Sequence, residues 1–132
     1  MTQYLLDTNA VIAILKAPNG PVSQCLRKHG PQDVAVSSLV MHELYYGAFH
    51  SQRVEHNLAI VDGLQFEVLE FDQEDARHAG EIRAQLAQSG TPIGAYDVLI
   101  AGQARARSIV LITRNVREFS RVSELSIENW EK

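Results

Sequence analysis

Three carboxylates in the sequence stand among apolar or small residues. Asp7 directly follows the apolar run 4–6, and Glu43 and Asp97 have largely apolar or small neighbours three and four positions away. No Lys or Arg lies within four residues of any of the three. Because an unpaired carboxylate is costly to remove from water, each needs a partner from elsewhere in the chain or from a ligand. A divalent cation would serve all three, and oxygen ligands of this kind suit Mg²⁺ or Mn²⁺.

Each acid also has a simpler interpretation. Asp7 can cap the helix that follows it, and Glu43 can lie half-exposed at the rim of a helix. Asp97 can be an acid in a first helical turn, where the helix dipole favours a negative charge. The three acids together are a more specific signal than any one of them.

The elements predicted around these acids alternate between strands and helices. Strands are predicted at residues 4–6, 34–36, 67–71 and 109–113, and a last edge strand is indicated at 126–130. Helices are predicted at residues 10–15, 22–28, 39–49, 54–64, 72–88 and 95–106, the first capped by Thr8 and Asn9 and the third by Ser38. This order is typical of a three-layer α/β/α domain with a central, mainly parallel sheet of four to five strands.

The carboxyl ends of the predicted strands are where a site is expected, because ligands bind there in open parallel sheets. Asp7 ends the first strand, and Asn115 lies just past the strand at 109–113. Glu43 lies about one turn into the helix after another strand, and Asp97 lies near the start of its helix. Thr113 can either donate its hydroxyl to the site or simply end its strand.

Length and composition predict a single domain over residues 1–132. The chain is 45% hydrophobic, which is enough for a core. Its longest apolar run, 10–15, is far shorter than the roughly 18 residues of a membrane span, and no signal peptide is visible. The single cysteine, Cys25, excludes an internal disulfide and a cysteine-based zinc cage. We therefore expect a cytoplasmic protein with no membrane partner.

The charge is unevenly distributed along the chain. The net charge is −4, whereas proteins that bind nucleic acids non-specifically are usually basic. Residues 101–121 nevertheless hold five arginines and only one acid, Glu118. These arginines are either a solvated face or a phosphate-binding rim. Arg114 and Arg117, which flank Asn115, are the candidates for phosphate contacts.

Four segments of the sequence resemble the motifs of PIN domains. LLDTNAVIAIL resembles the first motif, and SSLVMHELYYGA resembles the second, with Glu43 as its acid. GTPIGAYDVLIAGQA resembles the third motif, with Asp97, and ITRNVREF resembles the closing motif, with Thr113 and Asn115. Order and spacing match over nearly the whole chain. Length and motif wording are most similar to the VapC toxins of bacterial type II toxin–antitoxin pairs.

The resemblance implies roles for particular residues. It implies a catalytic set of Asp7, Glu43, Asp97 and Asn115, with the metal held by Asp7, Asp97 and Glu43. The residues expected to support this set or to contact substrate phosphates are Thr8, Asn9, Thr113, Arg114 and Arg117. The family often carries a fourth acid at the position of Asn115, and Glu118 follows three residues later. The number of bound metal ions therefore stays open at this stage.

The resemblance also implies an activity and partners. It implies a Mg²⁺- or Mn²⁺-dependent endoribonuclease that cleaves tRNA, initiator tRNA and its anticodon region among the candidates, and so inhibits translation. The implied protein partner is a VapB-type antitoxin, which blocks the site and binds operator DNA, so that the toxin contacts DNA only through the antitoxin. A homodimer and a larger hetero-oligomer with the antitoxin are expected.

Other interpretations stay open at this stage. Asn115 keeps open a catalytically weak or inactive PIN-like module that binds RNA or regulates. A phosphoacceptor domain of the response-regulator type would need an acidic pair after the first strand and a Lys after the last, where Asp7-Thr8-Asn9 and Arg114 stand instead. A haloacid-dehalogenase-like phosphatase would need a second acid at Asn9.

Overall fold

A parallel sheet forms the centre of the computed structural model, which describes residues 1–131. Over these residues the sheet has five strands in the order β3-β2-β1-β4-β5, all paired in parallel. The strands are β1 (Tyr4–Leu6), β2 (Val34–Ser37), β3 (Glu67–Leu69), β4 (Val110–Ile112) and β5 (Ile127–Glu128). The predicted fold class is confirmed, and the short strand at the C-terminal edge is present.

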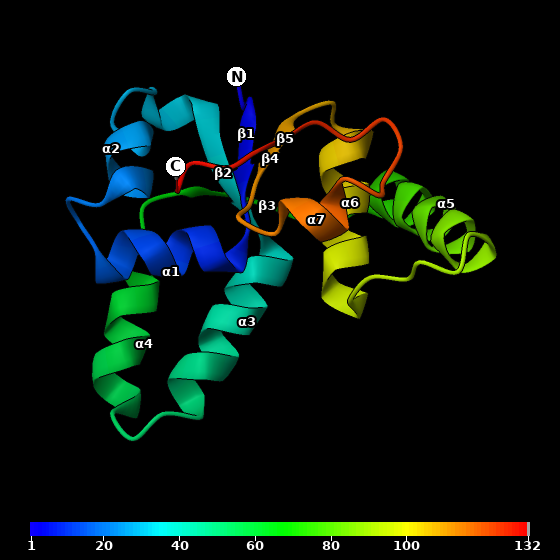
Figure 1. Cartoon of the computed structure of the whole chain (residues 1–132). Helices are drawn as coiled ribbons and strands as arrows, with labels where there is room; N and C mark the ends of the chain where they lie inside the picture. Colours follow the sequence, from blue (N-terminus) through cyan, green and yellow to red (C-terminus); the bar gives the residue numbers. More distant parts are fainter. Residues whose placement is uncertain (132) are drawn as a thin grey trace.

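Helices cover both faces of this sheet (Figure 1). One layer contains α1 (Thr8–Lys16), α2 (Pro21–Leu26), α3 (Ser38–Phe49) and α4 (Val54–Asp62). The other contains α5 (Gln73–Gln88), α6 (Ala95–Ala106) and α7 (Val116–Phe119). Right-handed crossovers require this division, because the chain moves outward from β1 to β3 and then returns to β4 on the other side of β1. No helix among residues 1–131 is long and apolar enough to cross a membrane.

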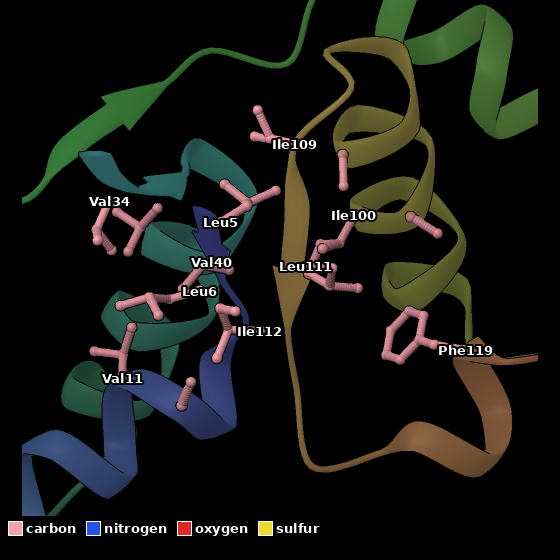
Figure 2. Packing of buried hydrophobic residues seen from close by; sticks show 14 of the residues in the cluster. Leu5, Leu6, Val11, Val34, Val40, Ile100, Ile109, Leu111, Ile112 and Phe119 are labelled. Atoms are coloured by element: carbon pink, nitrogen blue, oxygen red, sulfur yellow. The ribbon is translucent and has the colours of Figure 1, made fainter. Parts of the chain in front are cut away.

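The core lies on both sides of the two central strands. Leu5 and Leu111 pair in register and are fully buried, as are Leu6 and Ile112 on the opposite face. Figure 2 shows Leu111 beside Ile100 on the α6 side of the sheet. Continuous apolar strands are expected where both faces of a parallel sheet are covered, so these short runs suffice to define β1 and β4.

Two helix starts differ from the sequence prediction. The cap of α1 is Asp7, as the alternative interpretation of that acid had it, and not Thr8 or Asn9; Asp7 Oδ1 accepts a hydrogen bond from the Ala10 backbone N–H at 2.8 Å. The cap of α3 is Ser37, not Ser38. In both cases the helix begins directly after the strand, so the last strand residue or the one after it becomes the cap. A 3₁₀ turn (Pro31–Asp33) and α7 were not predicted, because both are too short for a periodic signal.

Gly102 allows α6 to approach α5 closely. A Cβ atom at position 102 would lie 2.6 Å from the backbone N, Cα and Cβ of Ala79. We expect Gly102→Ala to lower the free energy of unfolding by about 1–3 kcal/mol, the usual cost of overpacking a core. Urea unfolding followed by circular dichroism measures this effect. Gly80→Ala on α5 is the matched control: its Cβ would meet nothing within 4 Å, and we expect it to stabilise the helix by about 0.5–1 kcal/mol. Equal stability of Gly102→Ala and the wild type would contradict this account of the α5–α6 contact.

Candidate active site

The predicted acids meet at the carboxyl edge of the sheet, where the strand order reverses. The chain leaves β1 toward β2 on one side, while β4 lies on the other side of β1. Asp7 directly follows β1, and Thr113 directly follows β4. In Figure 1 the first turns of α1, α3 and α6 all begin near this edge. Such reversal points are the usual ligand sites of open α/β sheets.

Asp7 is held in place by the helix that it caps. Its side chain is 7% exposed, and one carboxylate oxygen is used by the Ala10 N–H. Burial raises the pKa of Asp7 above its ordinary value, against hydrogen bonds from Thr113 and Ala10 that lower it. Asp7 is therefore both a cap and a buried, partly compensated charge. Asp7 can therefore cap α1 and still take part in a site.

Glu43 is oriented by the residue after Asp7. The Thr8 hydroxyl donates a hydrogen bond to Glu43 Oε1 at 2.7 Å, joining the start of α1 to the second turn of α3. Glu43 is half-buried. One of its oxygens is thus fixed by Thr8, which leaves Oε2 for a ligand.

Asp97 is surrounded by other carboxylates. It lies half-buried in the first turn of α6. Burial, a hydrogen bond with Glu118 and the charges of Glu118, Asp7 and Glu43 together raise the pKa of Asp97 to about 6. Asp97 is therefore close enough to the other three acids for their negative charges to repel. The structure thus brings the predicted acids together.

Glu118 is the residue of the site that the sequence analysis did not assign. It lies on α7, and its Oε2 accepts a hydrogen bond from Asn115 Nδ2 at 2.6 Å. The Asn115 backbone N–H in turn donates to Thr113 Oγ1 at 2.9 Å. The available signal was the spacing of Asn115 and Glu118, which places both on one face if a helix begins at this point.

The carboxylates share one pattern of support. A neighbouring donor binds one oxygen of Asp7, of Glu43 and of Glu118. Asp7 also accepts a hydrogen bond from Thr113, and Glu118 also shares one with Asp97. Asn9, also predicted to support the site, is exposed on the first turn of α1 and makes no side-chain hydrogen bond within residues 1–131. Thr113 is almost fully buried beside Asp7.

The donor set fits a hard divalent cation that keeps part of its hydration shell. Carboxylate oxygens are the preferred ligands of Mg²⁺, which is commonly held by one or two carboxylates, several waters and substrate phosphates. Within residues 1–131, no three Asp, Glu, His or Cys side chains lie close enough together to hold a metal ion by themselves. A cation at this site would therefore need water molecules or substrate oxygens as further ligands.

Four of the five arginines of residues 101–121 divide into two groups, and the fifth, Arg121, donates a hydrogen bond to the Pro92 carbonyl oxygen at 3.3 Å. Arg105 and Arg107 are engaged on the outer layer: Arg105 pairs with Glu81, and Arg107 pairs with Asp75 at 3.0 Å. Arg114 and Arg117 are exposed next to the site, and Arg114 is near enough to lower the pKa of Asp7 slightly. Only these last two are placed for contacts with a substrate phosphate at the site.

The comparisons with known proteins agree with this geometry. The PIN domain family matches residues 4–125. The tRNA(fMet)-specific endonuclease VapC of Shigella flexneri is 43% identical over 98% of this chain and 99% of its own length. The crystal structure of DNA-bound VapBC from Salmonella typhimurium contains a chain that is 41% identical, with a TM-score of 0.93 over 98% of this chain and 99% of that one. The structure of VapBC2 from Rickettsia felis bound to a promoter DNA fragment contains one that is 32% identical, with a TM-score of 0.91 over 98% and 99%.

Proposed function

The chain belongs to the PIN-domain family, and we propose that it is a metal-dependent endoribonuclease that acts as the toxin of a type II toxin–antitoxin pair. The observation that carries this proposal is the meeting of Asp7, Glu43, Asp97 and Glu118 at the reversal point of the sheet. Relatives that match this chain over almost their whole length are named as endonucleases and ribonucleases. A catalytically inactive module was kept open because of Asn115, and Glu118 beside it weakens that reason.

Mg²⁺ or Mn²⁺ is the cofactor that the donor set supports. We assign Asp7, Asp97 and Glu43 as residues that would hold it, with Glu118 as the fourth acid. When bound, the cation supplies positive charge that stabilises the transition state at phosphorus and lowers the pKa of a water molecule. Burial and the repulsion among these acids raise the pKa of Asp97, and a bound cation would compensate the negative charge that causes this repulsion.

Residues of the site and around it orient the attacking water, accept its proton and hold the acids in position. Glu43, fixed by Thr8, orients a water molecule with its free oxygen, and Glu43 or Asp97 accepts the proton as that water attacks phosphorus. Thr113 and Asn115 keep Asp7 and Glu118 in position. Attack by water leaves 5′-phosphate and 3′-hydroxyl ends. Products with 2′,3′-cyclic phosphate ends would contradict this mechanism, since they require attack by the ribose hydroxyl.

The substrate and partners that we propose follow the relatives. We propose tRNA as the substrate, initiator tRNA first, because two relatives that are 43% and 41% identical to this chain are named tRNA(fMet)-specific endonucleases. We propose a VapB-type antitoxin as the protein partner, since similar chains occur in VapBC complexes bound to DNA. A homodimer, a larger hetero-oligomer with the antitoxin, DNA contact only through the antitoxin and a cytoplasmic location complete the proposal.

An RNA cleavage assay tests the proposed function. The purified chain is incubated with total tRNA in Mg²⁺, in Mn²⁺ or with EDTA, and the fragment ends are mapped. Asp97→Asn, prepared in parallel, controls for a contaminating nuclease. Discrete fragments that require the metal and disappear in the variant support the proposal. Folded protein that cuts no RNA in either metal would favour the inactive module instead.

The phosphate contacts give a prediction of their own. We expect the double variant Arg114→Glu/Arg117→Glu to weaken RNA binding and to reduce the slope of log affinity against log salt by about 1 per residue. Arg77→Glu is the control, because Arg77 makes only an exposed contact with Glu74 at 3.9 Å on α5. Affinity is measured by fluorescence anisotropy from low to moderate salt. If both variants behave alike, Arg114 and Arg117 do not contact the substrate.

A further inference from the structure

Two exposed rings form a stack beside the acids. His42 on α3 and Tyr96 on α6 stack with their ring centroids 5.6 Å apart and their planes inclined by 29°. Each ring immediately precedes one of the acids in the sequence, Glu43 or Asp97. The pair therefore joins the two helices that carry these acids, across the carboxyl edge of the sheet.

This stack is not part of the core. His42 is exposed, and Tyr96 is 42% exposed. The Tyr96 hydroxyl makes no hydrogen bond to residues 1–131, so no polar partner explains its position. A large, partly exposed ring beside a reaction site suits the binding of another flat group.

Two further aromatic rings lie along the surface of α3, farther from the acids. Tyr46 and His50 lie at successive four-residue steps from His42 and therefore share its side of the helix. Their rings stack with centroids 5.4 Å apart and planes inclined by 11°, and Tyr46 is 63% exposed. The helix thus presents a row of rings that begins at the acids.

The helix that carries these rings holds few acids. The chain as a whole carries a net charge of −4, yet Glu43 is the only acid in α3, and Arg53 follows at the start of α4. Gly47 lies four residues after Glu43 on the site-facing side, and a Cβ there would meet nothing within 4 Å. The helix face next to the acid is thus left open for a bulky ligand.

We propose that the His42–Tyr96 stack binds an unpaired RNA base next to the phosphate at the acids, and that Tyr46 and His50 continue this row of stacked bases. The inference rests on the proposed nuclease function and adds the residues that would bind a base beside the cleaved phosphate. Aromatic side chains stack on any unpaired base but cannot reach the face of a base inside a duplex. The site therefore selects loops or single strands over helices.

Substitutions at Tyr96 test the stack directly. We expect Tyr96→Leu, which keeps an apolar side chain but removes the ring face, to bind a hairpin-loop RNA about tenfold more weakly, since stacking on one aromatic ring contributes on this scale. Tyr96→Phe keeps the ring face and is expected to remain within about twofold of the wild type. Phe49→Leu, which removes an exposed ring of α3 outside the two stacks, is the matched control. Binding is measured by anisotropy in EDTA, and unfolding curves verify that the variants fold.

An RNA that lacks one base makes the test specific. A single abasic nucleotide is moved stepwise along the loop, and one position is expected to weaken binding to the wild type about tenfold while leaving Tyr96→Leu unaffected. Equal sensitivity of both proteins at every position would overturn the stack. So would a change in sedimentation of Tyr96→Leu or Tyr46→Leu with unchanged RNA affinity, because the rings would then contact a second copy of the chain. Wild-type protein that neither binds nor cuts RNA would overturn the nuclease proposal as well. If the wild type cuts RNA but no abasic position affects it more than Tyr96→Leu, only the proposed stack is overturned.

Discussion

Asp97→Asn is expected to lower metal-dependent RNA cleavage by about 100- to 1,000-fold while the protein remains folded. Burial is the largest cause of the raised pKa of Asp97, and Glu118, Asp7 and Glu43 raise this pKa further. The amide removes the charge that would hold a cation but preserves the size of the side chain. Losing one preorganised charge at a reacting phosphate costs about this factor. Initial rates on a single tRNA at saturating Mg²⁺ measure the effect.

Asp97→Asn is also expected to differ from the wild type in how its stability changes between pH 5 and pH 7.5 in the absence of metal. The pKa of Asp97 is about 6 in the folded protein and has its ordinary value of 3.8 in the unfolded chain. Between these two values the folded state binds more protons, so the stability of the wild type falls as pH rises through this window and stays lower above it. The stability of Asp97→Asn should not fall in this way, because its amide does not titrate. Saturating Mg²⁺ should remove most of the fall in stability from the wild type. Thermal unfolding measures both effects, with Glu55→Gln, at an exposed position of α4, as the control. An identical pH profile for Asp97→Asn and the wild type would contradict the reading of Asp97 as an uncompensated charge.

The sequence was sufficient to predict the sheet and three of the four acids for one physical reason. Apolar runs such as Leu5-Leu6 define buried strands, and a carboxylate without nearby cations, such as Glu43, stands out against them. Both signals are local. The predicted fold class is therefore confirmed, and Asp7, Glu43 and Asp97 lie near one another as expected.

Contacts between distant parts of the chain could not be predicted in this way. Arg107 meets Asp75 from 32 residues away, so the basic segment is smaller on the surface than its composition indicated. Glu118 approaches Asp97 only because α7, a helix of four residues, turns it inward. A single turn carries too little periodicity to be recognised, and Glu118 in the sequence is simply one more acid among arginines.

Glu118→Gln and Asn115→Asp together test whether Glu118 acts as the fourth acid. We expect Glu118→Gln alone to reduce cleavage by about 100-fold, since it removes one of four converging charges. Asn115→Ala alone is expected to cost about tenfold, because Glu118 then loses the donor at 2.6 Å that fixes one of its oxygens. Adding Asn115→Ala to Glu118→Gln should change little further, since two residues that act through one group are not additive.

Moving the charge completes this argument. In Asn115→Asp/Glu118→Gln the carboxylate shifts from α7 to the residue that precedes it, with the glutamine amide now able to donate to the new acid. If the site needs a fourth negative charge near Asp97, the double variant should recover at least tenfold of the activity lost in Glu118→Gln, about 1.4 kcal/mol of transition-state stabilisation. Additive losses in every combination would show instead that Glu118 only supports the fold of the 113–119 turn. In that case the site has three working acids, and Asn115 itself faces the substrate.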